Sequence, residues 1–320
     1  MIRPHVHPVR LLMTCAAALG LLSAVAVASG PRTVVAFDSA AKQTPENLAI
    51  ADDGTIYVSL AFASEIRRIA PDGVQTALTM PTLGGITVGV AIDRHHGGDL
   101  DVAVRSPNAA AAGIWRVPRR RFAHPTRIAA LPTNSFPNGI TFDAAGNLYI
   151  ADSTLGAVWR IAPGASHATA WARSKLLSPT GASFENFPLP GANGIKVRGD
   201  RVYVTNTATE TVLAIPIRPN GLAGQITVRL RGIQGDDFAF AANGDMYIAE
   251  NPLSKLIRVS PSGRITLIAT AANGLDNPSA VAFDPRATRR ANLYITNSAY
   301  FGTHPSLQEL ATRTMGERLP

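Results

Sequence analysis

The sequence has little cysteine, few aromatic residues and few charges. Its one cysteine, Cys15, lies in an apolar N-terminal stretch, so the rest of the chain offers no disulfide and no thiolate chemistry. Aromatic residues make up 6% of the chain and charged residues 16%, whereas 46% of the residues are hydrophobic. This composition is typical of a globular protein with a substantial core, and it excludes a disordered chain.

Acidic residues are outnumbered by basic ones, and the formal net charge is +8. The arginines are dispersed, however, and the one cluster, Arg119-Arg120-Arg121, has no aromatic residues among them. Such a run is typical of a solvated face rather than of a nucleic-acid interface. We therefore expect a small-molecule substrate and no nucleic-acid partner, and the sequence gives no oligomeric state.

The first 28 residues have the pattern of a secretory signal peptide. Arg3 and Arg10 precede an apolar run that starts at Leu11, and Ala26-Val27-Ala28 is a small-x-small cleavage pattern. We predict cleavage after Ala28, export to the periplasm or the medium, and no stable membrane insertion of the mature chain. An uncleaved anchor is the alternative, because about 18 apolar residues are just enough to span a bilayer.

Residues 29–320 contain a repeated unit: an apolar run, a polar turn and an apolar-Tyr-apolar run. Its tyrosines are Tyr57, Tyr149, Tyr203, Tyr247 and Tyr294, and a degenerate copy begins at Val88. Two further short runs follow in each unit, for example AVWRIAP and HATAWA. Six units of four short strands at a regular period predict one all-β domain, a six-bladed β-propeller, and the period argues against a long antiparallel sandwich.

The last unit is one strand short. Its third strand is expected at SLQELA, residues 306–311, and the chain ends before a fourth. The run TVVAFD, residues 33–38, precedes the first unit and has the pattern of a fourth strand. We predict that this N-terminal strand completes the C-terminal blade, which closes the ring and removes an exposed sheet edge.

The residue that starts each innermost strand belongs to a ring around one mouth of the central channel. Counting back eight residues from the hairpin glycine places three such residues, and the other units add theirs; the ring is Glu46, Val88, Asn138, Asn193, Asp236 and Ser279. Two carboxylates and two amide carbonyls are ligands for a hard divalent ion. Ca²⁺ is expected, with Zn²⁺, Mg²⁺ or Mn²⁺ as alternatives, whereas polar residues that merely cap strand starts are the structural alternative.

The stretches PENLAIADDG, PNGITFDAAGNLYIADS, ANGIKVRGDRVYVTN and DDFAFAANGDMYIAE resemble the senescence marker protein (regucalcin)/gluconolactonase family of six-bladed propellers. Paraoxonases, diisopropyl fluorophosphatase and strictosidine synthase are more loosely similar. The resemblance implies a metal held by Glu46, Asn138, Asn193 and Asp236, and hydrolysis of lactones or related esters. It also implies Asp236 as the general base, with Asp237 as the alternative. Asp237 stands where the family usually has glycine.

Further residues are expected on the same face, as substrate-binding groups. Arg105 and His304 follow second strands, and Asp152 is the first member of an expected second polar ring with Asn206, Glu250 and Asn297. The connection 173–192 is long and contains several apolar residues, which predicts a lid over the mouth. His95 and His96 lie in a hairpin turn that we expect on the opposite face, exposed to solvent.

The sequence leaves three functions open. The first is an exported, metal-dependent hydrolase of lactones or esters. The second is a non-catalytic propeller that binds a protein or glycan and carries a structural metal. The third is a lyase or an enzyme similar to strictosidine synthase on the same scaffold.

Overall fold

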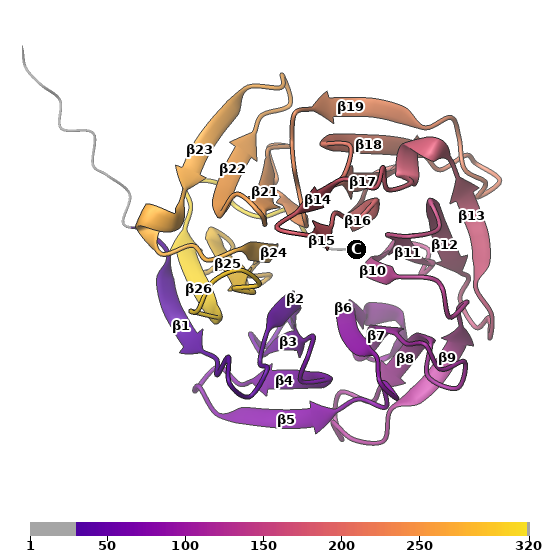
Figure 1. Cartoon of the computed structure of the whole chain (residues 1–320), viewed down its shortest axis with the longest axis horizontal. Coiled ribbons are helices and arrows are strands. Elements are labelled where there is room, and N and C mark those ends of the chain that lie inside the picture. The colour runs from indigo at the N-terminus through magenta and orange to yellow at the C-terminus, as the bar shows by residue number, and fades with distance from the viewer. Residues whose placement is uncertain (1–29, 319–320) are drawn as a thin grey trace, which may run out of the picture.

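Six four-stranded antiparallel sheets surround a central channel in the computed structural model, which describes residues 30–318 (Figure 1). The predicted six-bladed propeller is therefore confirmed. The predicted signal peptide lies outside the described residues. No helix of residues 30–318 is long and apolar enough to cross a membrane.

Blades 1 to 3 follow one another along the chain, and each runs from the channel outward. Blade 1 is β2 (Pro45–Ile50), β3 (Ile56–Leu60), β4 (Glu65–Ile69) and β5 (Gln75–Thr79). Blade 2, the degenerate copy, is β6 (Ile86–Asp93), β7 (Asp99–Arg105), β8 (Gly113–Val117) and β9 (Thr126–Ala130). Blade 3 is β10 (Pro137–Phe142), β11 (Leu148–Asp152), β12 (Ala157–Ile161) and β13 (Thr169–Arg173).

Blades 4 to 6 complete the ring. Blade 4 is β16 (Ala192–Arg198), β17 (Arg201–Asn206), β18 (Thr211–Pro216) and β19 (Thr227–Arg231). Blade 5 is β20 (Phe238–Phe240), β21 (Met246–Glu250), β22 (Lys255–Val259) and β23 (Ile265–Ala269). Blade 6 is β24 (Pro278–Phe283), β25 (Asn292–Asn297), β26 (Ser306–Ala311) and β1 (Arg32–Ala36).

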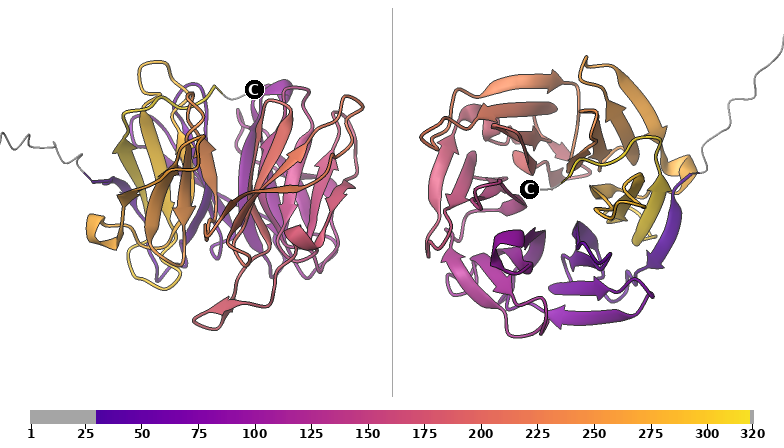
Figure 2. Two further views of the ribbon diagram at one scale, coloured as in Figure 1. Left: turned by 90° about the horizontal axis from the view of Figure 1, so that it is seen from above. Right: turned by 180° about the vertical axis from the view of Figure 1, so that it is seen from behind.

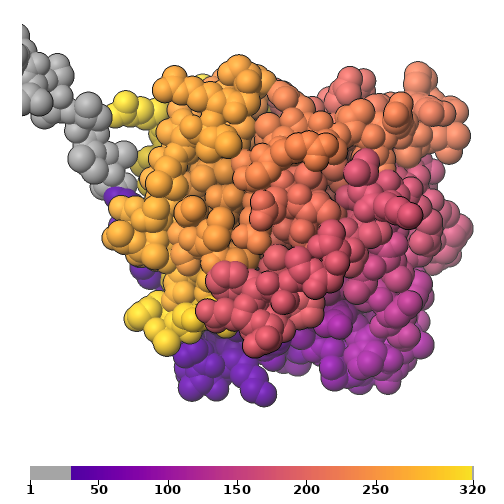
Figure 3. Space-filling view, turned by 45° about the horizontal axis from the view of Figure 1, so that its top comes forward, coloured from indigo at the N-terminus to yellow at the C-terminus, as the bar shows by residue number. Residues whose placement is uncertain are grey.

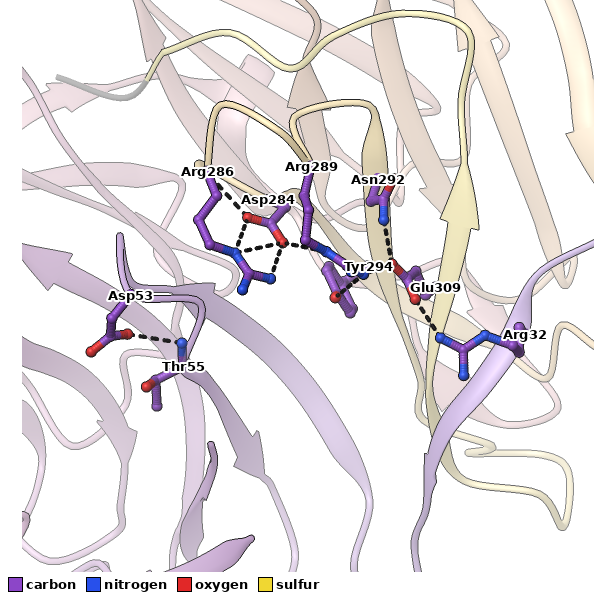
Figure 4. Close-up of polar contacts among 9 residues, drawn as sticks. All are labelled: Arg32, Asp53, Thr55, Asp284, Arg286, Arg289, Asn292, Tyr294 and Glu309. Atoms are coloured by element: carbon purple, nitrogen blue, oxygen red, sulfur yellow. Dashed lines mark hydrogen bonds and ion pairs between the residues drawn. The ribbon is translucent and has the colours of Figure 1, made fainter. Parts of the chain in front are cut away.

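The N-terminal strand closes the ring, as predicted. β1 pairs antiparallel with β26, and Arg32 lies opposite Glu309. The Arg32 guanidinium donates to Glu309 Oε2 at 2.5 Å, and Arg289 and Asn292 donate to the other oxygen of the same carboxylate (Figure 4). One carboxylate therefore links the first strand of the propeller to its last blade.

Apolar side chains fill the spaces between neighbouring blades, and this explains the repeated tyrosine of the second strands. Tyr57, for example, is buried and lies against Phe122 of blade 2, with ring centroids 5.8 Å apart. Tyr149 is buried as well, and its hydroxyl donates to Asp143 at 3.1 Å. Tyr149 is thus a packing residue whose polar tip is satisfied within the adjoining turn.

The channel has two different ends. At one end the innermost strands begin, and the connection between blades 3 and 4 projects from the body as a hairpin (Figure 2). At the other end the C-terminal residues cross the opening: the Glu317 amide donates to the Phe240 carbonyl at 3.0 Å, and its carboxylate pairs with Arg198 at 2.9 Å. We call the first end the mouth and the second the far end.

His95 and His96 lie at the far end, as expected. They belong to the short 3-10 helix η1 (Arg94–His96) between β6 and β7, and both side chains are exposed. His96 Nδ1 is 2.6 Å from the Asp93 carboxylate, and His95 lines the far end of a channel cavity of about 290 Å³. Neither residue approaches the residues of the mouth.

Candidate functional site

A β-bulge at the start of the innermost strand places three members of the quartet. In blades 1, 3 and 4 the pairing with the second strand shifts register at Pro45/Asn47, Pro137/Ile140 and Ala192/Ile195. Glu46, Asn138 and Asn193 lie inside these shifts. A bulge inserts an extra residue and re-aims its side chain away from the regular alternation.

The glycine after each asparagine allows neighbouring blades to approach closely. A Cβ atom on Gly139 would lie 2.7 Å from the Asn193 carbonyl oxygen, and one on Gly194 would lie 2.5 Å from the Asp236 carbonyl oxygen. Real Cβ atoms do not come so near to backbone oxygens. The Asn-Gly pair therefore has two functions: asparagine supplies a ring side chain, and glycine admits the backbone of the next blade.

Hydroxyl groups of the second strands hold the ring in place from one blade to the next. Ser153 Oγ donates to the Ala192 carbonyl at 2.8 Å, and Thr207 Oγ1 donates to the Gly235 carbonyl at 2.8 Å. Ser279, a ring member itself, donates to the Pro45 carbonyl at 3.0 Å. All of these groups are buried, so the bonds are shielded from water and fix the ring backbone.

The four predicted metal ligands are all buried at the mouth. The amide nitrogens of the two asparagines are used: Asn138 Nδ2 donates to Ser153 Oγ at 3.2 Å and Asn193 Nδ2 to Thr207 Oγ1 at 3.0 Å. These bonds leave the carbonyl oxygens for a ligand. Asn193 Oδ1 is buried and has no hydrogen-bond partner among the described residues 30–318, which is costly unless another group satisfies it.

The two acids of the quartet interact with each other. Burial raises the pKa of the Glu46 carboxyl from 4.5 to about 7; the Tyr300 hydroxyl lowers this pKa and the Asp237 charge raises it. Burial also raises the pKa of Asp236 well above 3.8, and the charges of Glu46 and Asp237 add to this effect. Two buried carboxyls close together favour a shared proton or a cation between them.

Asp237 has a different environment from Asp236. Its carboxylate accepts two hydrogen bonds from Lys196 Nζ, at 2.5 and 2.6 Å, and one from Asn47 Nδ2 at 3.2 Å. Lys196 comes from blade 4 and Asn47 from blade 1, so this layer ties three blades together across the channel. Asp237 is the alternative general base of the sequence analysis, and its carboxylate is engaged in this ion pair.

The chemistry of the quartet fits a hard cation. Across residues 30–318, no three His, Cys, Asp or Glu side chains group closely enough to hold an ion. The candidate donors at the mouth are instead Glu46 and Asp236 with the two amide oxygens, of which Asn193 Oδ1 is unsatisfied among residues 30–318. Oxygen-only sets of this kind suit Ca²⁺, and also Mg²⁺ or Mn²⁺, better than thiolate-seeking metals.

The predicted substrate-binding residues are scattered in the structure. Arg105 is exposed at the end of β7, and its guanidinium lies 4.7 Å from the centre of the Phe136 ring, two residues before Asn138. His304 is on the mouth face, but its side chain is 87% exposed and lies beside Asp276. Of the predicted substrate-binding residues, Arg105 thus lies beside the segment that leads to Asn138, and Asp237 directly follows the ring residue Asp236.

The expected second polar ring faces its own turns instead of the mouth. Asp152 is fully buried and accepts from the backbone amides of Phe136 and Leu155 and from Trp159 Nε1 at 2.8 Å. Asn206 likewise donates to the carbonyls of the lid connection, and Asn297 and Glu250 bond within their own blades. These side chains close turns, so we leave Asp152 out of the proposed site.

Tyr300 is the mouth residue that sequence reasoning missed. It lies in the connection between β25 and β26, and its hydroxyl donates to Glu46 Oε2 at 2.5 Å. The same argument that placed His304 on the mouth face applies to Tyr300, four residues earlier in that connection. Sequence reasoning also missed Lys196. The sequence does mark this position, because Lys196 is a charged residue in an innermost strand where the other units have small or apolar residues.

No family model and no curated protein matches the chain. Among solved structures it is similar to regucalcin from Agrobacterium tumefaciens, a calcium-binding protein, with a TM-score of 0.65 at 17% identity over 92% of this chain and 97% of that one. It is also similar to a gluconolactonase from Xanthomonas campestris, with a TM-score of 0.61 at 16% identity over 88% and 94% of the two chains. Virginiamycin B lyase from Staphylococcus aureus has a TM-score of 0.57 at 19% identity, over 82% and 79%.

These similarities show a shared fold. The structural neighbours include regucalcin and gluconolactonases, as the sequence motifs predicted, and the chain shares their propeller fold. At such identities the neighbours do not transfer an activity.

Proposed function

We propose that this chain is an exported, metal-dependent hydrolase of lactones or related esters. The observation that carries the proposal is the buried, unpartnered Asn193 Oδ1 beside two carboxyls, Glu46 and Asp236, whose pKa values burial raises. A divalent cation held by these groups and Asn138 would satisfy the amide oxygen and offset the two buried charges. Ca²⁺ is the proposed ion.

When bound, such an ion supplies Lewis-acid polarisation of an ester carbonyl. Asp236 is the proposed general base, because its buried carboxylate lies at the mouth beside the other oxygen donors that would hold the ion. Its carboxylate takes a proton from the attacking water as the new bond from oxygen to the acyl carbon forms. The proton then passes to the leaving alkoxide when the ring C–O bond breaks, and the product is a hydroxy acid.

Asp237 is not proposed as the base. Lys196 and Asn47 donate three hydrogen bonds to its carboxylate, so both of its oxygens are already engaged. Its proposed function is to fix Lys196 in the layer behind the quartet. Asp236 and Asp237 thus make a matched pair, adjacent in sequence and different in environment.

The pair gives the test of the proposal. Asp236→Asn is expected to abolish lactone hydrolysis, by at least about a hundredfold in kcat, while the protein still binds Ca²⁺. Asp237→Asn is the control, which should keep turnover within about tenfold and lower the thermal stability. Undiminished hydrolysis by Asp236→Asn would eliminate the assignment of the base.

The alternatives make different predictions. A non-catalytic binding propeller would release no acid from any lactone, with or without a chelator. A lyase similar to the virginiamycin enzyme has less support here: a histidine-to-alanine variant of that enzyme is catalytically inactive, whereas every histidine within residues 30–318 of this chain is exposed. Chelator-sensitive release of acid from a lactone panel distinguishes the three functions.

A further inference from the structure

The connection between blades 3 and 4 forms a hairpin that crosses the mouth. Its strands, β14 (Ser183–Phe184) and β15 (Phe187–Pro188), pair with each other and with no blade. The ring centroids of Phe184 and Phe301 are 5.1 Å apart, and Phe187 stacks on Tyr300 with ring centroids 6.1 Å apart. Tyr300 and Phe301 belong to blade 6, on the other side of the ring. Figure 3 shows this red-pink segment beside yellow atoms of blade 6. The predicted lid is thus an ordered hairpin.

The hairpin is built to hold its tip in position. Glu185 and Asn186, its two turn residues, both have positive φ angles, of 47° and 65°, as a tight two-residue hairpin turn requires. At its base Leu177 is fully buried, and Asn206 Nδ2 donates to the carbonyls of Leu176 and Ser178 at 2.9 and 3.0 Å. The aromatic side chains near the tip therefore stand on a fixed stem.

These aromatic side chains form one wall of the mouth, next to the quartet. Phe62 from blade 1 meets Tyr300 edge to face at 5.8 Å, so blades 1 and 6 and the hairpin all contribute rings. Phe62 is still 46% exposed and Phe187 44% exposed, which leaves apolar surface uncovered. The Tyr300 hydroxyl donates to Glu46, so the aromatic wall continues directly into the ligand set.

We propose that the mouth binds small lactones or esters that carry an aromatic or alkyl group, in preference to polyhydroxylated sugar lactones. This inference rests on the proposed function. A carbonyl at the quartet would place its substituent against Phe187, Phe62 and Tyr300, where apolar surface is removed from water. The hydroxyl groups of a sugar lactone would lose water at this wall and find few partners there, since Phe187 and Phe62 have no polar side-chain atoms and the Tyr300 hydroxyl already donates to Glu46.

The test compares dihydrocoumarin, an aromatic lactone, with δ-gluconolactone on the Ca²⁺-loaded protein. Wild type is expected to show the higher kcat/KM for dihydrocoumarin. Phe187→Ala should lower that value about tenfold, equivalent to about 1.4 kcal/mol, with little change for gluconolactone, and Phe187→Leu should recover most of the loss. Leu222→Ala is the matched control, because Leu222 is 54% exposed in a turn at the far end.

The outcomes separate this inference from the proposed function. If gluconolactone is the better substrate, or if Phe187→Ala leaves the preference unchanged, the inference that the mouth prefers apolar substituents is wrong. The proposed hydrolase function is not affected by that result. If no lactone is hydrolysed, the proposed function fails, and binding of the lactam 3,4-dihydroquinolin-2-one decides the inference. Lactam binding that Phe187→Ala weakens and Leu222→Ala does not supports an aromatic ligand site; absence of lactam binding overturns it.

Discussion

The buried acids at the mouth predict an unusual dependence of stability on pH in the metal-free protein. The pKa of Glu46 in the folded protein is about 7, above its ordinary value of 4.5 in the unfolded chain. The folded state therefore holds the proton more tightly. The stabilisation that this gives is complete below about pH 4.5 and is lost as the pH rises through 7.

The magnitude follows from the size of the pKa change. At about 1.4 kcal/mol for each pH unit, Glu46 alone lowers the free energy of unfolding by about 3 kcal/mol between pH 4.5 and 8. Asp236 acts in the same direction, because burial also raises its pKa. A metal ion that binds the ionised carboxyls should remove the dependence, and Ca²⁺ at a hundred times its Kd adds about 2.7 kcal/mol.

The assay is urea unfolding of the chelated protein at pH 5.5, 6.5, 7.5 and 8.5, with and without excess Ca²⁺. The free energy of unfolding of the chelated protein should fall from pH 5.5 to 8.5. That of the Ca²⁺-bound protein should stay nearly constant or rise. Glu46→Gln should reduce the slope of the chelated protein, since it removes one of the two titrating groups. A chelated wild type whose stability is constant or rises from pH 5.5 to 8.5 would refute the reasoning.

Three further predictions concern single residues. Gly139→Ala should destabilise the fold by about 1–3 kcal/mol in urea unfolding, because its Cβ would lie 2.7 Å from the Asn193 carbonyl; an unchanged midpoint would contradict this. Tyr300→Phe should weaken Ca²⁺ binding severalfold at pH 6.5 and less at pH 8.5, since the hydroxyl lowers the pKa of Glu46; calorimetric titration at both pH values checks it. Glu309→Ala should cost about 1–3 kcal/mol, since it removes the carboxylate that joins the first strand to the last blade; proteolysis of the N-terminal strand should accelerate accordingly.

The sequence predicts most of the fold because the architecture is periodic. Each unit carries the same alternation and the same turn, so even the degenerate copy from Val88 could be assigned to a blade by its position in the series. The closure by residues 33–38 followed from a strand missing at one end and a strand left over at the other. The positions of ring residues also follow from the repeat, because equivalent positions meet at the axis.

Contacts between different blades could not be predicted in this way. The Tyr300–Glu46 hydrogen bond joins residues 254 positions apart, and the Asp237 carboxylate meets Lys196 and Asn47 from two other blades. No local pattern encodes which side chain reaches across a channel. Asp152 shows a related difficulty: a carboxylate at a strand end can face the mouth or close its own turn, and only the structure distinguishes the two.

The central claim is that the mouth quartet binds one divalent cation. The most direct test is calorimetric titration of Ca²⁺ into the chelated wild type and into Asn193→Ala, combined with elemental analysis of the purified protein. We predict one divalent ion per chain and at least a tenfold weaker affinity in Asn193→Ala, because that variant removes the unpartnered amide oxygen. Wild type that binds no divalent ion, or Asn193→Ala that binds it as tightly, would contradict the account.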